Sequence, residues 1–468
     1  MKQISAIIYS AILSISAVSH SAASTELPEI ITDKIEFQVE VAGKECTPMS
    51  LNDCLLYARQ NARTNRLNRL KTETAHADKR IAAADLMPYL SLSGSTSLSF
   101  GRNIDPETNT YDNKKTLGSA LGINLSLPLF DGLVSINNLK TARIEELRSH
   151  KNYLVEEDKI SLEVIKNFYN VAYCRALVQQ MERQLTRDST DLAATRRGEE
   201  LGTKSGADVA ELEAVVASDL YELTNQKNLL KKGYLDLRGS MGMPLSEEPM
   251  SLFFDTLDNQ DLSDYAGLST MPGRRSKLPE IEDAELAVKA SRYSLYAARG
   301  GYSPRLTLTG GISSSYYRLV GKGTIAESFR SQFRNNMGEY IGLSLSFPIF
   351  DGLATTNRVK RAQVALRESV TRLEEAEYQI QKASDEALLD RDAAIEELTA
   401  AHRRLEAEEI AYKAVRRKYE LGMASAIDLY TAGSKLATAE ATLTGKRIQR
   451  VISEITLRYY QGVPLIKE

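Results

Sequence analysis

Motifs that bind metals or phosphates place histidine and lysine at characteristic spacings in the sequence. His76, His150 and His402 stand apart along the sequence, with no HExxH pattern and no carboxylate at metal spacing, so solvated or packed histidines are favoured over ligands. The run Gly321-Lys322-Gly323 lacks both the leading glycine and the following Ser or Thr of a phosphate-binding loop. We therefore expect no catalytic residue, no cofactor and no metal site, and an enzyme is the least favoured class.

The cysteines likewise do not indicate a metal site. Cys46, Cys54 and Cys174 are an odd number with no CxxC spacing, which argues against a zinc site. Cys46 and Cys54 either form a disulfide, which an oxidising compartment would permit, or remain two free thiols. Cys174 lies in a helical run, and we expect it to be a small buried apolar residue.

The first residues predict export from the cytoplasm. Lys2, an apolar stretch over residues 4–18 and the small residues Ser21, Ala22 and Ala23 follow the three-part pattern of a secretory signal peptide. We expect cleavage after Ala23, a mature start at Ser24 and no lipid anchor, because no Cys follows the cleavage site. The net charge of −3 and the pI near 6.0 lack the electrostatic footprint of a nucleic-acid-binding protein.

The sequence is an internal duplication. Residues 121–245 align with residues 341–465 at a constant offset of 220, and LGINLSLPLFDGLVSINNLKTA faces IGLSLSFPIFDGLATTNRVKRA. Upstream, Pro88 and Gly94 match Pro304 and Gly310 at an offset of 216. We expect one architecture that occurs twice in the chain, rather than two or three unrelated domains.

Each half contains two runs that predict amphipathic strands. From Leu90 to Phe100, apolar side chains alternate with five serines, so one face of the strand is apolar and the other carries hydroxyls. Similar runs begin at Leu121, Leu306 and Ile341. Each run has about ten residues or slightly more, which is the length that a tilted strand needs to cross hydrocarbon. We expect two isolated hairpins with polar loops at residues 103–117 and 318–339, and since four strands cannot close a barrel around a pore, oligomerisation must supply the rest.

Long helices are predicted after each Asp-Gly pair. From Leu353 to Leu421 the chain has no Pro or Gly, and a helix of that length would measure about 100 Å. A seven-residue stripe indicates coiled-coil-like packing; its members are Val359, Leu366, Leu373, Ile380, Ala387, Ala394 and Ala401. Shorter helices are expected at residues 208–237 and 428–457, with others leading into the hairpins at 51–84 and 281–298.

Tight turns should join each long helix to its shorter return helix. The pattern ELGxxSxxD occurs twice, with Gly202 and Gly422 as helix stops, Ser205 and Ser425 as the next caps, and then Asp208 and Asp428. These turns would form the tip of each helical hairpin.

Taken together, the chain after about residue 48 resembles the TolC family of outer-membrane efflux proteins. The motifs that carry the resemblance are MSLNDCLLYARQN, LPEIEDAELAVKA, the two strand-to-helix junctions SLPLFDG and SLSFPIFDG, and the two ELGxxSxxD turns. The resemblance implies a mixed α+β membrane protein: a homotrimer with a 12-stranded transmembrane β-barrel in outer-membrane lipid, four strands per chain, continued by a long α-helical barrel in the periplasm. Its partners would be a periplasmic adaptor protein and an inner-membrane pump of the RND or ABC type.

The same resemblance implies a gate where the helices converge. Asp208 and Asp428 match the turn aspartates of the family and Tyr419 its latch tyrosine, but Ala424 stands where the family has an arginine. Glu211 occupies an acidic position of the first turn that is Thr431 in the second. We hypothesise a bond from the Tyr419 hydroxyl to the Asp208 carboxylate, with the alternative that both aspartates only cap their helices; the two roles can coexist.

These expectations divide the chain into a signal peptide (residues 1–23), an N-terminal extension (24–50), a first repeat (51–245), an equatorial linker (246–280) and a second repeat (281–468). The predicted function is the exit duct of a tripartite efflux or type I secretion system in the outer membrane of a Gram-negative bacterium. The alternative from another class is a coiled-coil scaffold or surface protein without a pore, which the heptads alone would support.

Overall fold

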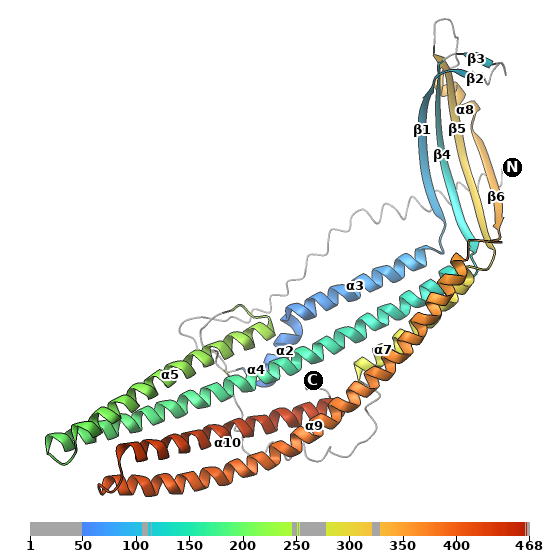
Figure 1. Ribbon diagram of the computed structural model, residues 1–468. Helices are drawn as coiled ribbons and strands as arrows, with labels where there is room; N and C mark the ends of the chain where they lie inside the picture. The colour runs from blue at the N-terminus through green and yellow to red at the C-terminus, as the bar shows by residue number, and fades with distance from the viewer. Residues whose placement is uncertain are drawn as a thin grey trace. The chain divides into compact units, whose positions relative to one another are not determined.

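The computed structural model describes residues 49–104, 111–113, 115–245, 250, 252, 278–320, 328–463 and 465 (Figure 1). The first half comprises α2 (Leu51–Asn61), α3 (Arg63–Ala84), β1 (Tyr89–Ser99), β2 (Arg102–Ile104), β3 (Tyr111–Asn113), β4 (Lys115–Phe130), α4 (Val134–Glu200) and α5 (Gly206–Met241). The second half comprises α7 (Pro279–Gly300), β5 (Arg305–Val320), α8 (Phe329–Asn335), β6 (Gly338–Ser346), α9 (Ala354–Glu420) and α10 (Ala426–Tyr460). The predicted signal peptide, Cys46 and most of the predicted linker lie outside the described residues.

The four long strands form one antiparallel sheet in the order β1-β4-β5-β6. β4 pairs with β1 on one side, as at Ile123 and Leu92, and with β5 on the other, as at Ile123 and Ile312. The two hairpins are separated in the sequence by helices, as expected, and β4 and β5 join them into one sheet. The alternation is confirmed: on β6, Ile341, Leu343 and Leu345 share one face and are 78%, 63% and 71% exposed.

The helices continue the sheet in the same order. α3 packs on α4, α4 on α7, and α7 on α9, and each of these helices adjoins one long strand in sequence (Figure 1). α4 and α9 have 67 residues each, which corresponds to about 100 Å, so the predicted lengths are confirmed. α5 returns along α4 and α10 along α9.

The strand-to-helix junctions have the same geometry in both halves. Leu133 and Leu353, the residues before α4 and α9, adopt left-handed conformations with φ of 65° and 66°. The Asp131 carboxylate then accepts bonds from the Ser135 backbone N–H at 2.8 Å and hydroxyl at 2.5 Å. Asp351 accepts from the backbone N–H and hydroxyl of Thr355 in the same way. The conserved spacing from Asp to a hydroxyl residue thus satisfies the first turn of each long helix.

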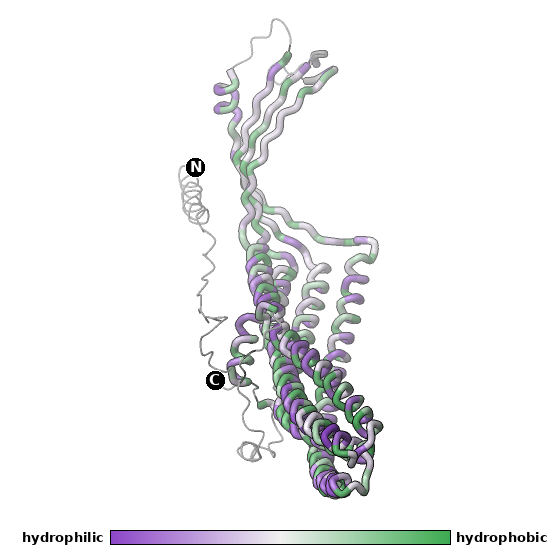
Figure 2. The backbone as a smooth tube through the Cα atoms, turned by 90° about the vertical axis from the view of Figure 1, so that its left-hand side faces the viewer, coloured by the Kyte–Doolittle hydropathy of each residue, from purple (hydrophilic) through white to green (hydrophobic). Residues whose placement is uncertain are grey.

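Apolar packing is concentrated where α2, α4 and α5 meet. Leu237 and Met241 of α5 and Val164 and Val171 of α4 are fully buried there, beside Cys54. Farther along α9, the predicted heptad stripe is confirmed as packing, because its members Ile380, Ala387, Ala394 and Ala401 are buried. Figure 2 shows hydrophilic and hydrophobic residues interspersed along the helices, and none of the helices in the described residues is long and apolar enough to cross a membrane.

Three local predictions are wrong. The helix expected over residues 51–84 is interrupted at Ala62, whose ψ of 130° is extended, and the break gives α2 and α3. The polar loop expected at residues 318–339 contains the end of β5, the short helix α8 with Ser328 as its cap, and the start of β6. In the loop expected at residues 103–117, β2 pairs with β3, and β4 begins at Lys115.

Candidate functional site

The two tip turns have the predicted geometry. Gly202 and Gly422 each have a φ of 72°, a left-handed conformation that glycine adopts without a steric penalty. Ser205 then caps α5: its hydroxyl accepts from the Asp208 N–H at 3.2 Å, and the Asp208 carboxylate accepts from the Ser205 N–H at 3.0 Å. Such a reciprocal pair of bonds is a capping box. Each turn is thereby fixed by groups within a few residues of sequence.

The second turn repeats the first. Ser425 and Asp428 exchange the same bonds at 3.2 Å and 3.0 Å. Bonds from the backbone and hydroxyl of Ser205 hold the pKa of Asp208 below its ordinary value, and Ser425 does the same to Asp428. Both aspartates are therefore ionised caps, as the capping alternative stated.

Tyr419 contacts other residues than the one hypothesised. Its hydroxyl is 2.8 Å from the Thr195 hydroxyl of α4, and the Lys204 ammonium lies 4.1 Å from the centre of its ring. The hydrogen bonds of the Asp208 carboxylate within this chain come from the backbone N–H and the hydroxyl of Ser205, and the hydroxyl of Tyr419 is paired with Thr195 instead. Tyr419 instead joins the end of α9 to the end of α4, and so joins one helical hairpin to the other.

Glu211 lies on α5, three residues after Asp208, and is partly exposed. In the part of the chain that the structure describes, no hydrogen bond or ion pair joins it to the other three predicted gate residues. The structure thus places all four residues at or next to the tip, without a hydrogen bond or ion pair that joins any two of them among the described residues.

A polar seam on α4, which the sequence analysis missed, runs toward the tip. Its members Gln180, Gln184 and Thr195 are buried, and each bonds a different helix: Gln180 donates to the Ala437 carbonyl of α10, Gln184 to Asp219 of α5 at 2.9 Å, and Thr195 pairs with Tyr419 of α9. Their spacing, with further polar residues at helical intervals between them, was the signal that could have identified the seam.

The seam includes a pair of carboxyl groups. Asp188 of α4 is hydrogen-bonded to Asp219 of α5, which is buried to 3% exposure. Burial and the neighbouring Asp219 raise the pKa of Asp188 to about 7, against the opposing effects of Arg187 and Gln184. Burial also raises the pKa of Asp191, the next acidic residue of α4. Arg416 of α9 opposes this rise, and Glu420 of α9 adds to it. Two carboxyl groups at one site favour sharing a proton over full ionisation.

The remaining chemical candidates have structural contacts. His76 pairs with Glu146 at 2.6 Å, beside Lys79. Cys54 is buried with a free thiol, and burial raises its pKa to about 12; Cys174 is also free and buried, as expected. Among the described residues, no group of three His, Cys, Asp or Glu side chains could hold a metal ion.

A sheet with an exposed apolar face, continued by helices about 100 Å long that turn at a polar tip, is the fold of a TolC-type outer-membrane channel. The chain belongs to the outer membrane efflux protein family, whose sequence profile matches residues 57–243 and 275–463. It is accordingly an outer-membrane efflux channel, as its sequence predicted.

Curated relatives and solved structures agree with this assignment. The cation efflux system protein CusC of Escherichia coli K12 is 25% identical over 420 residues, covering 85% of this chain and 83% of CusC. The toluene efflux pump outer membrane protein TtgC of Pseudomonas putida is 24% identical over 407 residues, covering 85% of this chain and 79% of TtgC. The crystal structure of the Campylobacter jejuni CmeC outer membrane channel superposes with a TM-score of 0.76 at 15% identity, covering 90% of each chain.

The carboxyl pair predicts a pH-dependent tip. A carboxyl pKa that folding raises from 3.8 to about 7 means that the folded state holds its proton more tightly than the unfolded state, so local stability is highest below pH 4 and falls as the pH rises toward 7. Asp188→Asn removes this loss. We expect amide hydrogen exchange of α5 around Asp219, corrected for its intrinsic rate, to accelerate between pH 4 and 8 in the wild type and to stay slow in the variant.

The matched control is Asp236→Asn. Asp236 is exposed and lies on α5, the helix whose exchange is measured, so this variant should keep the wild-type pH dependence. An unchanged pH dependence in Asp188→Asn would show that the carboxyl pair does not determine the stability of this region.

Proposed function

We propose that three copies of this chain form a continuous exit duct, with twelve strands closed into a β-barrel in the outer membrane and the helices extending through the periplasm. Each chain supplies four long strands, and about eight are needed before a barrel can enclose even one small ligand. The observation that carries the proposal is that β1 and β6 each have one strand neighbour in the described sheet. An edge strand with an unpaired side can pair with a strand of another chain, and a closed ring of copies would pair every such edge.

The surface of the sheet supports its placement in lipid. Leu90, Leu92 and Leu98 of β1 expose apolar side chains on the same alternation as β6. The opposite face of β1 carries serines, and Asn124 of β4 bonds Ser93 on that polar side. An apolar outside with a hydroxyl-lined inside is the arrangement of a membrane barrel that holds water.

We extend the proposal to the partners: a periplasmic adaptor protein at the helical tip and an inner-membrane pump of the RND or ABC type. The names of the relatives support a pump-linked duct, because CusC is described as part of a cation efflux system and TtgC as part of a toluene efflux pump. These two relatives are similarly distant from this chain in sequence, and their names refer to different substrates, cations and toluene. We infer that the partners select the substrate, and that the duct itself performs no reaction.

For organisation along the chain we keep the divisions expected from sequence: a signal peptide over residues 1–23, an extension over 24–50, repeats over 51–245 and 281–468, and a linker over 246–280. The equal lengths of α4 and α9 support the two repeats.

The tip is the proposed gate. Three copies would bring Asp208, Glu211 and Asp428 into acidic rings at the narrow end, which favours the passage of cations. Tyr419 would hold the closed state through its bond to Thr195, because that bond links the two helical hairpins of one chain. Polar contacts between hairpins can be exchanged for water on opening at less cost than an apolar core.

A test of the gate compares Tyr419→Phe with Thr195→Val. Each removes one hydroxyl of the same bonded pair. That bond is worth about 1 kcal/mol in each subunit, so each variant should raise the leak through the closed channel in a planar bilayer. The double variant should leak no more than either single variant, because the two substitutions break one interaction.

Tyr378→Phe, at an exposed tyrosine farther from the tip on α9, is the control and should conduct as the wild type does. Additive effects of the two tip variants, or wild-type leakage in both, would exclude the Tyr419–Thr195 bond as the latch.

The duct itself is tested by extracting the full-length protein in detergent. We expect a particle of three chains by native mass measurement, and ion conductance after reconstitution into a planar bilayer. A stable monomer without conductance would contradict the duct and favour the pore-free scaffold.

A further inference from the structure

The short helix α8 lies beside β5 at the end of the sheet that is farthest from the long helices (Figure 1). β6 pairs with β5 only as far as Gly338, opposite Ser313, whereas β4 stays paired with β5 as far as Val320. Along the rest of β5, α8 takes the place of β6. The Gln332 side-chain amide donates to the Tyr317 carbonyl and accepts from the Tyr317 N–H, both at 3.0 Å. α8 is thereby held at the edge of the sheet.

The alternation along β5 shows which face of the sheet α8 covers. Ile312 lies on the apolar face, where it is paired with Ile123 of β4, and Ser314 and Tyr316 follow on that same face. They are only 6% and 9% exposed. The Ser314 hydroxyl donates to the Phe333 carbonyl, and the Tyr316 ring centre lies 5.0 Å from that of Phe329. α8 therefore lies on the apolar face, which contacts lipid in the proposed barrel.

Aromatic rings stand at this end of the apolar face. Phe329 of α8 is 54% exposed and stacks on Phe333, with the ring centres 5.3 Å apart. On the β1 side of the sheet, Phe100 is 66% exposed and follows Leu98 on the apolar face. Membrane barrels carry girdles of aromatic residues where lipid meets water. Since the helices of the proposed duct extend into the periplasm, this end of the sheet lies at the outer leaflet.

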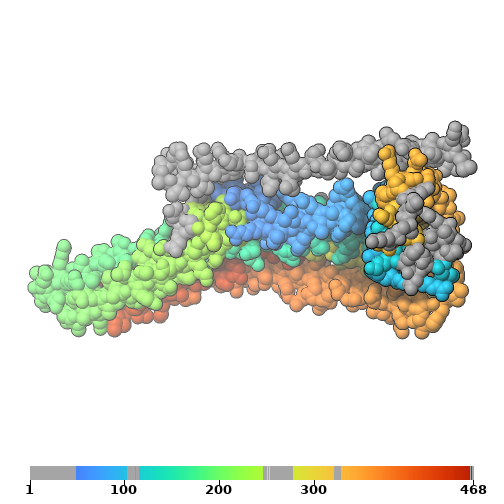
Figure 3. Space-filling view, turned by 90° about the horizontal axis from the view of Figure 1, so that it is seen from above, coloured from blue at the N-terminus to red at the C-terminus, as the bar shows by residue number. Residues whose placement is uncertain are grey.

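Beyond these rings the sheet carries cationic side chains. Arg318 follows Tyr316 by two residues and therefore lies on the same face of β5. Lys115 of β4 pairs with Val320, the next residue on that face, and its ammonium lies 5.4 Å from the centre of the Phe100 ring. Figure 3 looks onto this end from above, with orange residues of the second repeat beside cyan residues of β4. Both cations are exposed.

α8 adds two further positive charges. Arg330 and Arg334 are four residues apart, so they lie on one side of the helix, and both are exposed. Of the side chains that the structure describes at this end of the apolar face, one is acidic, Glu339 of β6. We call the four cations the outer cationic patch: Lys115, Arg318, Arg330 and Arg334.

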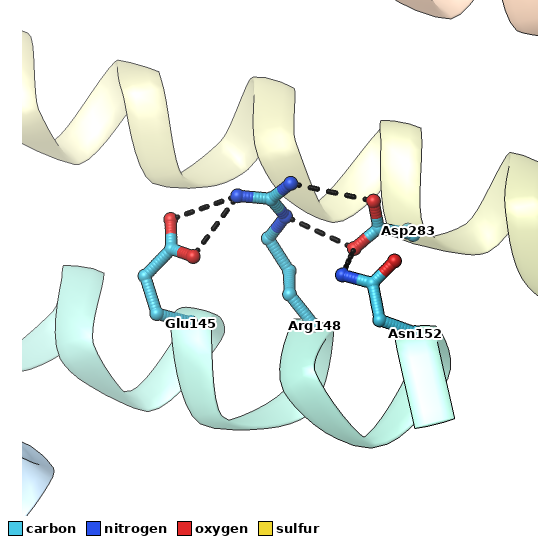
Figure 4. Close-up of polar contacts among 4 residues, drawn as sticks. All are labelled: Glu145, Arg148, Asn152 and Asp283. Carbon is cyan, nitrogen blue, oxygen red and sulfur yellow. Dashed lines mark hydrogen bonds and ion pairs between the residues drawn. The ribbon is translucent and has the colours of Figure 1, made fainter. Parts of the chain in front are cut away.

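The three arginines of the patch differ from the arginine between the long helices. Arg148 of α4 binds Asp283 of α7 through Nε at 3.1 Å and Nη2 at 3.3 Å, and Glu145 of its own helix at 2.9 Å (Figure 4). Within the described part of the chain, no side-chain hydrogen bond or ion pair engages any arginine of the patch. Their guanidinium groups are therefore available to an anion from outside the chain.

We propose that the outer cationic patch binds the phosphate groups of lipopolysaccharide, the glycolipid of the outer leaflet. The proposal rests on the duct described above, because the duct places this end of the sheet at that leaflet. A guanidinium group donates two parallel hydrogen bonds to phosphate oxygens. The patch directly continues an apolar face, so its occupant must combine an anionic group with apolar chains. A phosphorylated lipid has both, and its acyl chains would pack beside Phe329.

The test measures binding of lipid A, the phosphorylated anchor of this glycolipid, to the full-length protein in detergent. We expect wild-type protein to bind lipid A more tightly than lipid A from which the phosphates have been removed, and to lose affinity as salt is raised. Arg330→Gln/Arg334→Gln removes two charged donors from exposed positions and should weaken binding of lipid A about tenfold or more.

Two further variants serve as controls. Arg305→Gln, at the opposite end of β5 and also exposed, should bind lipid A as the wild type does. Arg330→Lys/Arg334→Lys keeps both charges and loses the paired donors, so its affinity should lie between those of the wild type and the glutamine variant. Far-UV circular dichroism checks that each variant keeps its helices.

The outcomes separate the patch from the duct. Equal binding of lipid A with and without phosphates, or wild-type affinity in the glutamine variant, would overturn the patch. Inorganic phosphate that binds as tightly as lipid A would identify a site for a free anion and overturn the lipid as occupant. A wild-type protein that conducts in a planar bilayer and shows these results would leave the duct standing. A wild-type protein without conductance would instead contradict the duct and remove the membrane placement on which the patch depends.

Discussion

The unpaired edges of one chain are the constraint from which the rest of the architecture follows. The strand order β1-β4-β5-β6 matches the helix order α3-α4-α7-α9. Each repeat therefore has two side edges, and one edge can pair with the other edge of a second repeat. One pair of sides is used inside the chain, where β4 meets β5 and α4 meets α7. The other pair remains at the outside, and in the ring that we propose the same contact would be repeated between copies.

The side chains that the helices bury change from apolar to polar along the length of the helices. Where α2, α4 and α5 meet, the interior contains Val164, Leu237 and Met241 and is apolar. Toward the tip, the contacts between helical hairpins pass through Gln180 and Thr195, which bond partners on α10 and α9. Hydrogen bonds exchange with water more readily than apolar packing does, so the polar end is the part suited to opening.

Features set by local sequence could be predicted. The capping boxes at Ser205 and Ser425, the left-handed glycines at the tips and the two 67-residue helices depend on residues close in sequence, and duplication gave each of them a second, independent example. Features set by the placement of distant segments could not. The partner of Tyr419 is Thr195, 224 residues away, and the Asp188–Asp219 contact depends on the register between α4 and α5. The break at Ala62 and helix α8 also lacked a strong local signal.

The most direct test of the closed ring is a cross-link between β1 of one copy and β6 of the next. In the chain, Asn124 of β4 faces Gly311 of β5; their equivalents at the offsets of 220 and 216 are Ser344 of β6 and Ser95 of β1. With the native cysteines replaced, oxidation of the Ser95→Cys/Ser344→Cys protein should give a covalent species of three chains that reductant releases, while Ser95→Cys/Leu345→Cys, whose thiols lie on opposite faces, should not. A channel that conducts but forms no such cross-link, or chains linked beyond three, would contradict the account.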